Sequence, residues 1–215
     1  MKIFLDSANC EAIRQAHETG LLDGVTTNPS KIAESGRPFT EVVKEICSIT
    51  PGPVSAEAVG ETADELVEMA VEISRIAPNV VVKIPMTVEG LTAVPVLENE
   101  KNIAVNVTMA FSSTQAWLAM KAGASYVSIV LSRLDAYANE SDILVEDAAA
   151  IRDNYGFPSE IIAGSVKTQN HLLACLRAGI DIATIPETLF FQAFDHPLTD
   201  MGLEQFARDW QRVKK

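Results

Sequence analysis

Two kinds of hydrophobic pattern alternate along this chain. Short runs rich in Val, Ile and Ala, bounded by turn residues, predict strands that are buried on both faces. Between them, apolar residues recur every three or four positions, which predicts amphipathic helices. Strands are expected near residues 2–7, 23–28, 54–59, 80–86, 103–108, 125–131, 160–166 and 180–185. Helices are expected at residues 10–19, 38–49, 62–76, 88–98, 112–122, 141–154, 168–178, 187–194 and 199–213.

The order of these elements predicts the fold. Eight strands that are each followed by a helix are typical of a (β/α)8 TIM barrel of the α/β class. The alternative is a doubly wound open sheet, but no glycine-rich phosphate loop follows the first strand. No long linker rich in Gly, Ser or Pro divides the chain. Residues 1–215 are therefore expected to form a single (β/α)8 barrel domain, in which residues 199–213 are an extra C-terminal helix.

Composition and charge narrow the range of partners. With 47% hydrophobic and 21% charged residues, the 215-residue chain has the composition of an ordinary soluble globular protein. Its formal net charge of −12 disfavours nucleic acids and anionic membrane surfaces, although a local basic pocket can still bind a small anion. No apolar run approaches the roughly 20 residues of a membrane-spanning helix. Charges also interrupt the N-terminus too early for a signal peptide.

Cysteine and histidine residues indicate neither a disulfide framework nor a metal site. The cysteines are scattered and lack CxxC spacing, which favours the reducing cytoplasm. His17 and His171 have no paired carboxylate or second ligand at metal spacing, so no catalytic role is expected for them. The cysteines are Cys10, Cys47 and Cys175.

Lys83 stands in the middle of the most apolar predicted strand, within Asn79–Thr87. Lysine is rarely buried without a reason, and loss of hydration favours the neutral amine. A neutral, desolvated amine is the nucleophile that Schiff-base chemistry with a carbonyl substrate needs. The structural alternative is a buried stem whose ammonium reaches water. The strand alone does not distinguish these two interpretations.

Polar residues also interrupt the carboxyl ends of the other predicted strands. In a barrel these ends meet on one face, where active sites lie. Because seven of the eight strands carry such a residue, a common site is favoured over scattered structural hydrogen bonds. The residues are Asp6, Thr26, Thr27, Asn28, Glu57, Lys83, Asn106, Thr108, Ser128, Arg133, Ser165 and Lys167.

Five segments resemble the motifs of the small transaldolases and the related fructose-6-phosphate aldolases. The resemblance covers residue 2 to about residue 210, and Gly24–Ser30 and Val82–Thr87 carry its most specific motifs. It implies a class I aldolase fold with no metal or other cofactor, sugar-phosphate substrates, and assembly into a homo-oligomer, either a pentamer or a decamer. The segments are Phe4–Ala8, Gly24–Ser30, Val82–Thr87, Asn106–Thr108 and His196–Asp200.

The resemblance also implies a role for each candidate residue. Lys83 matches the Schiff-base nucleophile, and Asp6 matches the acid/base that handles the C4 hydroxyl. Glu57 and Thr108, with an ordered water, match the proton relay for imine formation and hydrolysis. The hydroxyl-binding positions are Asn28, Asn106 and Ser128, and the phosphate pocket is Arg133, Ser165 and Lys167. A planar guanidinium, a hydroxyl and a point charge together suit a dianion.

Three of these residues also have simple structural interpretations. Asp6 could cap the first helix, and Ser165 could cap the helix after the seventh strand. Arg133 could form a surface ion pair with Asp135. Taken without the family resemblance, the structural interpretation is favoured for Ser165 and Arg133.

Glu57 favours one of the two family activities. Transaldolases carry glutamate at this position, whereas the aldolases carry glutamine. The expected enzyme therefore transfers a dihydroxyacetone unit from fructose 6-phosphate or sedoheptulose 7-phosphate to an aldose phosphate. Two residues depart from the transaldolase pattern: Val130 replaces an aromatic residue, and Lys167 is typical of the aldolases. The alternatives are a fructose-6-phosphate aldolase that releases free dihydroxyacetone, or a non-catalytic sugar-phosphate-binding barrel.

Overall fold

The computed structural model describes residues 1–213, in which eight parallel strands close into a barrel in their order along the chain. This confirms the predicted (β/α)8 fold. The fifth strand begins and ends two residues later than predicted, and the other seven lie within their predicted ranges. The strands are β1 (Lys2–Asp6), β2 (Gly24–Thr26), β3 (Val54–Glu57), β4 (Val80–Pro85), β5 (Val105–Ala110), β6 (Tyr126–Val130), β7 (Glu160–Gly164) and β8 (Ile182–Ile185).

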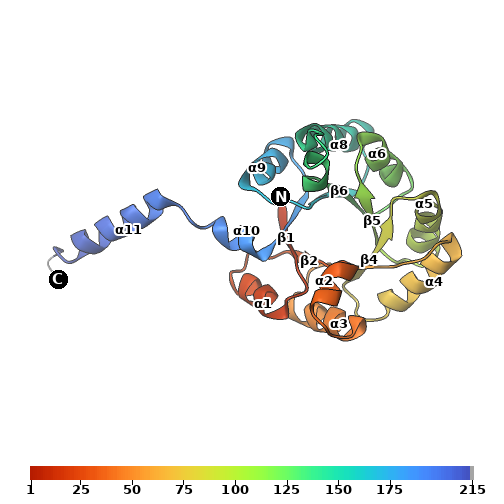
Figure 1. Cartoon of the computed structure of the whole chain (residues 1–215), viewed down its shortest axis with the longest axis horizontal. Coiled ribbons are helices and arrows are strands. Elements are labelled where there is room, and N and C mark those ends of the chain that lie inside the picture. Colours follow the sequence, from red (N-terminus) through yellow and green to blue (C-terminus); the bar gives the residue numbers. More distant parts are fainter. Residues whose placement is uncertain (214–215) are drawn as a thin grey trace.

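Helices form a ring around the barrel (Figure 1). Within residues 1–213, no helix combines the length and the apolar character needed to cross a bilayer. The helices are α1 (Cys10–Glu18), α2 (Pro29–Glu34), α3 (Phe39–Ile49), α4 (Ala63–Ser74), α5 (Val88–Pro95), α6 (Ser113–Lys121), α7 (Ser132–Asp135), α8 (Ser141–Tyr155), α9 (Gln169–Ala178), α10 (Glu187–Gln192) and α11 (Pro197–Trp210), together with the π-helix η1 (Val96–Glu100).

Two short helices, α2 and α7, were not predicted. Each has too few residues for its apolar periodicity to be recognised. The start of α2 nevertheless carries a local sequence pattern: Asn28 caps it by accepting a hydrogen bond from the backbone N–H of Lys31, and Pro29 occupies the first turn. Both helices follow strands at their carboxyl ends, so they lie at the face where the candidate site was expected.

Side chains that point into the barrel change from apolar to polar along the strands. Near the amino ends, Phe4, Ile162 and Ile182 form a buried cluster against which Tyr126 packs. Gly24 leaves room for this cluster, because a Cβ there would lie 2.7 Å from the Phe4 ring. Two residues further along the same strands, side chains point the same way. These residues are Asp6, Ser128 and Thr184, and Gly164 at the equivalent position of β7 has no side chain. The apolar cluster thus closes the barrel below a polar floor.

The C-terminal helix α11 projects away from the barrel (Figure 1). It begins at Pro197, two residues before the predicted start, because His196 accepts the cap hydrogen bond from the N–H of Leu198. No residue of α11 is buried. Leu203, Phe206 and Trp210 are 62%, 71% and 71% exposed, and their spacing of three and four residues places them on one side of the helix. An apolar stripe of this kind is typical of a helix that packs against a partner.

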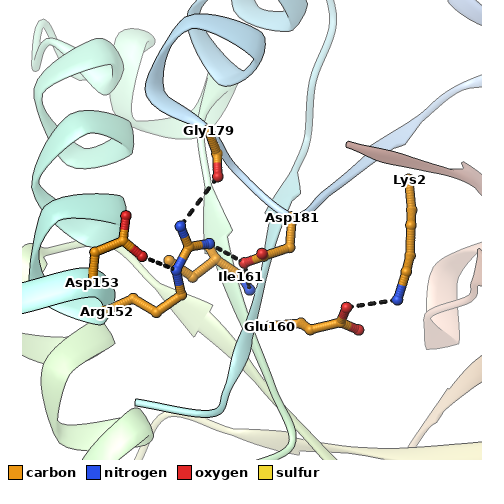
Figure 2. Close-up of polar contacts among 7 residues, drawn as sticks. All are labelled: Lys2, Arg152, Asp153, Glu160, Ile161, Gly179 and Asp181. Carbon is orange, nitrogen blue, oxygen red and sulfur yellow. Dashed lines mark hydrogen bonds and ion pairs between the residues drawn. The ribbon is translucent and has the colours of Figure 1, made fainter. Parts of the chain in front are cut away.

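A charged network joins β7 and β8 at the amino ends of the strands, opposite the polar floor (Figure 2). The Arg152 guanidinium forms an ion pair with Asp181, pairs with Asp153 at 2.7 Å, and donates to the Gly179 carbonyl at 3.2 Å. Asp181 also accepts the backbone N–H of Ile161 at 2.8 Å. Because the Arg152 side chain is only 13% exposed, its charge depends on these partners for solvation.

We expect Asp181→Ala to lower the free energy of unfolding by about 2–3 kcal/mol, because it removes one charged partner of the Arg152 guanidinium and the acceptor of the Ile161 N–H. Asp153→Ala is the matched control. Asp153 binds the same guanidinium but is 66% exposed, so its loss should cost less than about 1 kcal/mol. Urea unfolding followed by circular dichroism measures both. Equal destabilisation by the two variants would contradict this ranking.

Candidate active site

A cavity of about 540 Å³ opens at the carboxyl ends of the strands. Nine of the ten predicted site residues line it, and their roles remain predictions. The exception is Asn106, which is completely buried and does not line the cavity. The nine residues are Asp6, Asn28, Glu57, Lys83, Thr108, Ser128, Arg133, Ser165 and Lys167. Segments that are far apart in the sequence therefore meet around one space, as expected for strand ends in a barrel.

Lys83 is 8% exposed, and its side chain points into the barrel instead of toward water. Its Nζ donates to the backbone carbonyl of Thr27 at 3.1 Å and lies 3.5 Å from Oε2 of Glu57. The register aligns Glu57 of β3 with Lys83 of β4, so the two side chains point into the barrel at the same height. The cavity therefore holds an amine beside a carboxylate that can accept its proton.

Asp6 ends β1 and lines the same cavity as Lys83. Burial raises the pKa of the Asp6 carboxyl, and the ammonium groups of Lys31, Lys83 and Lys167 act in the opposite direction. Glu34 adds a smaller effect that also raises this pKa. A buried carboxyl group with a raised pKa holds a proton more readily than an exposed one, which suits exchange of a proton with a substrate. Asp6 does not cap α1, because the cap is Asn9.

Asn106 organises the polar floor from its buried position. Its amide nitrogen donates to the Ser55 hydroxyl at 3.2 Å, and its carbonyl accepts the Ser128 hydroxyl at 2.7 Å. Asn106 pairs with Lys83 across β4 and β5. The hydrogen bond with Asn106 therefore fixes the orientation of the Ser128 hydroxyl at the cavity wall. In this structure, Asn106 acts on the cavity through Ser128.

The opposite side of the cavity carries Arg133 on α7 and Ser165 and Lys167 after β7. Both cations are exposed, and within residues 1–213 no carboxylate lies within 4 Å of either. The Ser165 and Ser132 hydroxyls hydrogen bond at 2.6 Å. Ser165 does not cap α9, because Thr168 does. Two unpaired cations beside a serine hydroxyl are suited to an anionic group.

The suggested ion pair between Arg133 and Asp135 does not form. Asp135 instead lies 2.8 Å from Nε2 of His171. The expectation that His171 has no paired carboxylate was therefore wrong. The two residues are 36 positions apart, so their contact depends on how the tertiary structure places α7 and α9, and it could not be found from sequence spacing.

Sequence reasoning also missed several residues that line the cavity. Lys31 lies in the first turn of the unpredicted helix α2, where the Asn28–Pro29 pattern is the local indication of a helix start. Thr184 has no sequence pattern of its own, and its hydroxyl hydrogen bonds with that of Thr26 at 2.7 Å across β1. Met109 and Ser165 have positive φ values of 65° and 55°, which is strained backbone of the kind that accumulates at functional sites. The residues missed are Lys31, Met109, Ser132, Gly164 and Thr184.

Metal binding is not supported by the side chains of the cavity. In the part of the chain that the structure describes, no three His, Cys, Asp or Glu residues gather as metal ligands. The chemistry that the arrangement offers is that of an amine nucleophile, two carboxyl groups that can move protons, and a cationic pocket for an anion.

Known proteins match the chain over nearly its whole length. The model of the family Transaldolase/Fructose-6-phosphate aldolase matches residues 3–215. "Probable transaldolase 1" of Listeria monocytogenes serotype 4b (strain F2365) is 50% identical over 215 residues, which is 100% of both chains. "Probable transaldolase" of Caulobacter vibrioides (strain NA1000 / CB15N) is 50% identical over 210 residues, covering 98% of this chain and 96% of the relative.

Solved structures with low sequence identity share the fold alone. Thiamine phosphate pyrophosphorylase from Pyrococcus furiosus superimposes with a TM-score of 0.61 at 13% identity, covering 88% of this chain and 87% of the other. Orotidine 5'-monophosphate decarboxylase from Methanocaldococcus jannaschii gives 0.61 at 14% identity, covering 88% and 90%.

The full-length family match and the relatives at about 50% identity confirm the resemblance seen in the sequence motifs. The chain therefore belongs to the transaldolase/fructose-6-phosphate aldolase family.

Proposed function

We propose that this protein is a transaldolase that transfers a dihydroxyacetone unit from a ketose phosphate to an aldose phosphate through a Schiff base on Lys83. The observation that carries the proposal is the buried Lys83 amine, 3.5 Å from the Glu57 carboxylate inside a 540 Å³ cavity. Fructose 6-phosphate and sedoheptulose 7-phosphate are the proposed donors.

In the proposed reaction, the Lys83 ammonium first gives a proton to Glu57, and the neutral amine then adds to the C2 carbonyl of the donor. A proton moves from the nitrogen to the new alkoxide oxygen to give the carbinolamine. Glu57 then returns its proton to the carbinolamine hydroxyl, which leaves as water and gives an iminium. Thr108 lines the cavity on β5, the strand after β4, and would hold the water that exchanges protons with Glu57. The close approach of Lys83 and Glu57 supports this assignment.

Asp6 is the proposed base at the C4 hydroxyl. As it takes that proton, the C3–C4 bond breaks, its electron pair moves into the iminium to form an enamine, and an aldose phosphate leaves. The reverse steps join the enamine to an acceptor aldehyde, and water then releases the product from Lys83. Arg133, Ser165 and Lys167 would bind the phosphate of donor and acceptor, while Asn28 and Ser128 would bind the hydroxyls of the dihydroxyacetone unit. Asn106, the tenth proposed residue, would act on the same hydroxyls through the hydrogen bond it accepts from Ser128.

Release of free dihydroxyacetone is the second candidate activity, and Val130 favours it. Val130 lines the cavity on β6, where the family places an aromatic residue. The smaller side chain leaves space in which water can approach the imine. Transfer remains the first proposal, because Glu57 is the residue of the transaldolases.

A homo-oligomer is proposed as the working form, either a pentamer or a decamer. The exposed stripe of Leu203, Phe206 and Trp210 on α11 has no partner among the described residues of its own chain. The barrel surface carries its own exposed apolar residues on α9, Leu173 and Leu176, at 44% and 53% exposure. A second copy of the chain can therefore cover both surfaces.

Borohydride trapping tests the nucleophile. In wild-type protein incubated with dihydroxyacetone, reduction should attach the three-carbon unit to Lys83, as mapped by peptide mass spectrometry. Lys83→Ala and Lys83→Arg should both lose trapping completely, since a guanidinium stays protonated and cannot add to a ketone.

Lys31→Ala and Lys167→Ala are the matched controls for this experiment. Both remove another lysine that lines the same cavity. Each should keep the adduct on Lys83. An adduct that persists in Lys83→Ala and maps to another lysine would show that Lys83 is not the nucleophile.

Val130→Phe should lower the ratio of dihydroxyacetone released to dihydroxyacetone transferred, with erythrose 4-phosphate as the acceptor. The ring fills the space beside the imine, so water attacks it less often. A change of about 1 kcal/mol in the barrier to hydrolysis alters this ratio roughly fivefold. Val130→Ile adds one methylene and should stay close to wild type. If the ratio in Val130→Phe is unchanged or higher while trapping on Lys83 is normal, this position does not control water access.

Native mass spectrometry should find the wild-type protein as a homo-oligomer. The double variant Phe206→Ser/Trp210→Ser should dissociate toward monomer, because it removes the two most exposed side chains of the stripe. Gln205→Ala, on another side of α11, should leave the mass unchanged. A monomeric wild type, or an intact oligomer in the double variant, would contradict the assigned role of α11.

A further inference from the structure

His171 lies between the two segments that carry the free cations of the cavity. Its Nε2 is 2.8 Å from Oδ2 of Asp135, which ends α7. Its Nδ1 accepts the backbone N–H of Lys167 at 3.3 Å. The imidazole therefore connects the helix of Arg133 with the backbone of Lys167, and at 15% side-chain exposure it is held in a nearly buried position.

Both nitrogens of the ring are used in a way that fits the neutral imidazole. The acceptor at Nδ1 requires the hydrogen to be on Nε2, where it faces the Asp135 carboxylate. The other oxygen of that carboxylate accepts the N–H of Ser141 at 3.2 Å, so the start of α8 fixes its orientation. An oriented carboxylate that fixes a histidine ring is a common way to position groups near an active site.

The segments that His171 connects are already adjacent where they leave β6 and β7. Leu131 N–H donates to the Gly164 carbonyl at 3.0 Å, and the Ser132 and Ser165 hydroxyls hydrogen bond at 2.6 Å. Arg133 and Lys167 lie one and two residues beyond these contacts. Beyond these contacts, strand pairing no longer joins the two segments. Among the described residues, the contacts from Asp135 through His171 to the backbone of Lys167 link them instead.

We infer that the Asp135–His171 pair is a positioning device that sets the separation of Arg133 and Lys167 and thereby the affinity of the cavity for the phosphate of its substrate. Two like charges repel each other, and long exposed side chains lose entropy when they converge on one anion. A fixed backbone beneath both cations lowers this cost before the substrate arrives. The inference rests on the proposed function in that it takes Arg133 and Lys167 as the phosphate pocket.

A purely structural link between α7 and α9 is the competing interpretation. It predicts that variants lose stability but bind phosphate normally. A positioning role instead predicts a selective loss of affinity for phosphorylated ligands, with little change in turnover or in Schiff-base formation with dihydroxyacetone, which carries no phosphate. The two interpretations therefore differ in a binding measurement.

Three conservative variants test separately the contact of His171 with Asp135 and its contact with the backbone N–H of Lys167. His171→Gln places a side-chain donor near the position of Nε2 but removes the acceptor for Lys167. His171→Asn keeps an acceptor near Nδ1 but does not reach Asp135. Asp135→Asn keeps the shape of the acceptor and removes its charge. His17→Asn, on α1, is the matched control.

Calorimetric titration with inorganic phosphate is the first measurement, and the KM and kcat for fructose 6-phosphate are the second. We expect each variant to raise the phosphate Kd and the KM about three- to tenfold, with kcat within about twofold of wild type and trapping of dihydroxyacetone unchanged. Arg133→Ala sets the upper limit, at about ten- to a hundredfold, since it removes a charged contact outright. The double variant Asp135→Asn/His171→Gln should bind phosphate no more weakly than the weaker-binding of the two single variants, because both substitutions break the same linkage.

Unchanged phosphate affinity and KM in all three variants, with or without a lower melting temperature, would overturn the inference and leave a structural link. So would a loss of affinity in His17→Asn of the same size. Failure of the proposed function gives a different result, because wild-type protein would then not be trapped by dihydroxyacetone. The phosphate titration would still measure the Asp135–His171 pair in that case.

Discussion

The buried contact between the Lys83 amine and the Glu57 carboxylate is the constraint on which the rest of the site depends. An ammonium in a barrel interior is costly unless a partner lies within reach, and Glu57 Oε2 at 3.5 Å and the Thr27 carbonyl at 3.1 Å are those partners. The same contact is useful for chemistry, because the group that stabilises the ammonium can also remove its proton. Closure of the parallel sheet in register brings Glu57 beside Lys83.

The barrel separates stability from chemistry along its axis. At the amino ends of the strands, the Arg152–Asp181 network and the apolar cluster around Phe4 hold the strands together. At the carboxyl ends, the interior is polar and two residues have strained backbone. Unfavourable features of the site, such as a buried amine and positive φ values at Met109 and Ser165, are tolerated because the other end of the barrel is well packed.

Positive charge is concentrated in the cavity of a chain that is acidic as a whole. The chain carries a net charge of −12, yet its cavity collects the cations Lys31, Lys83, Arg133 and Lys167. Among the described residues, no carboxylate lies within 4 Å of the Arg133 guanidinium or the Lys167 ammonium, so both can bind an anion. A basic cavity in an acidic protein can bind a small anion, while the overall negative charge disfavours large polyanions.

The sequence by itself determined the succession of strands and helices, the barrel, and most of the residues at the cavity, because strand periodicity and chain order fix which residues reach the carboxyl ends. Lys83 could be singled out because a charge in an apolar strand is conspicuous within a few residues. The tertiary structure alone decided the contacts between distant segments: the Asp135–His171 pair, the place of Lys31 at the cavity, and the burial of Asn106 behind Ser128. These depend on distances between elements far apart in the chain, and such distances are set by packing, which leaves no periodic pattern in the sequence.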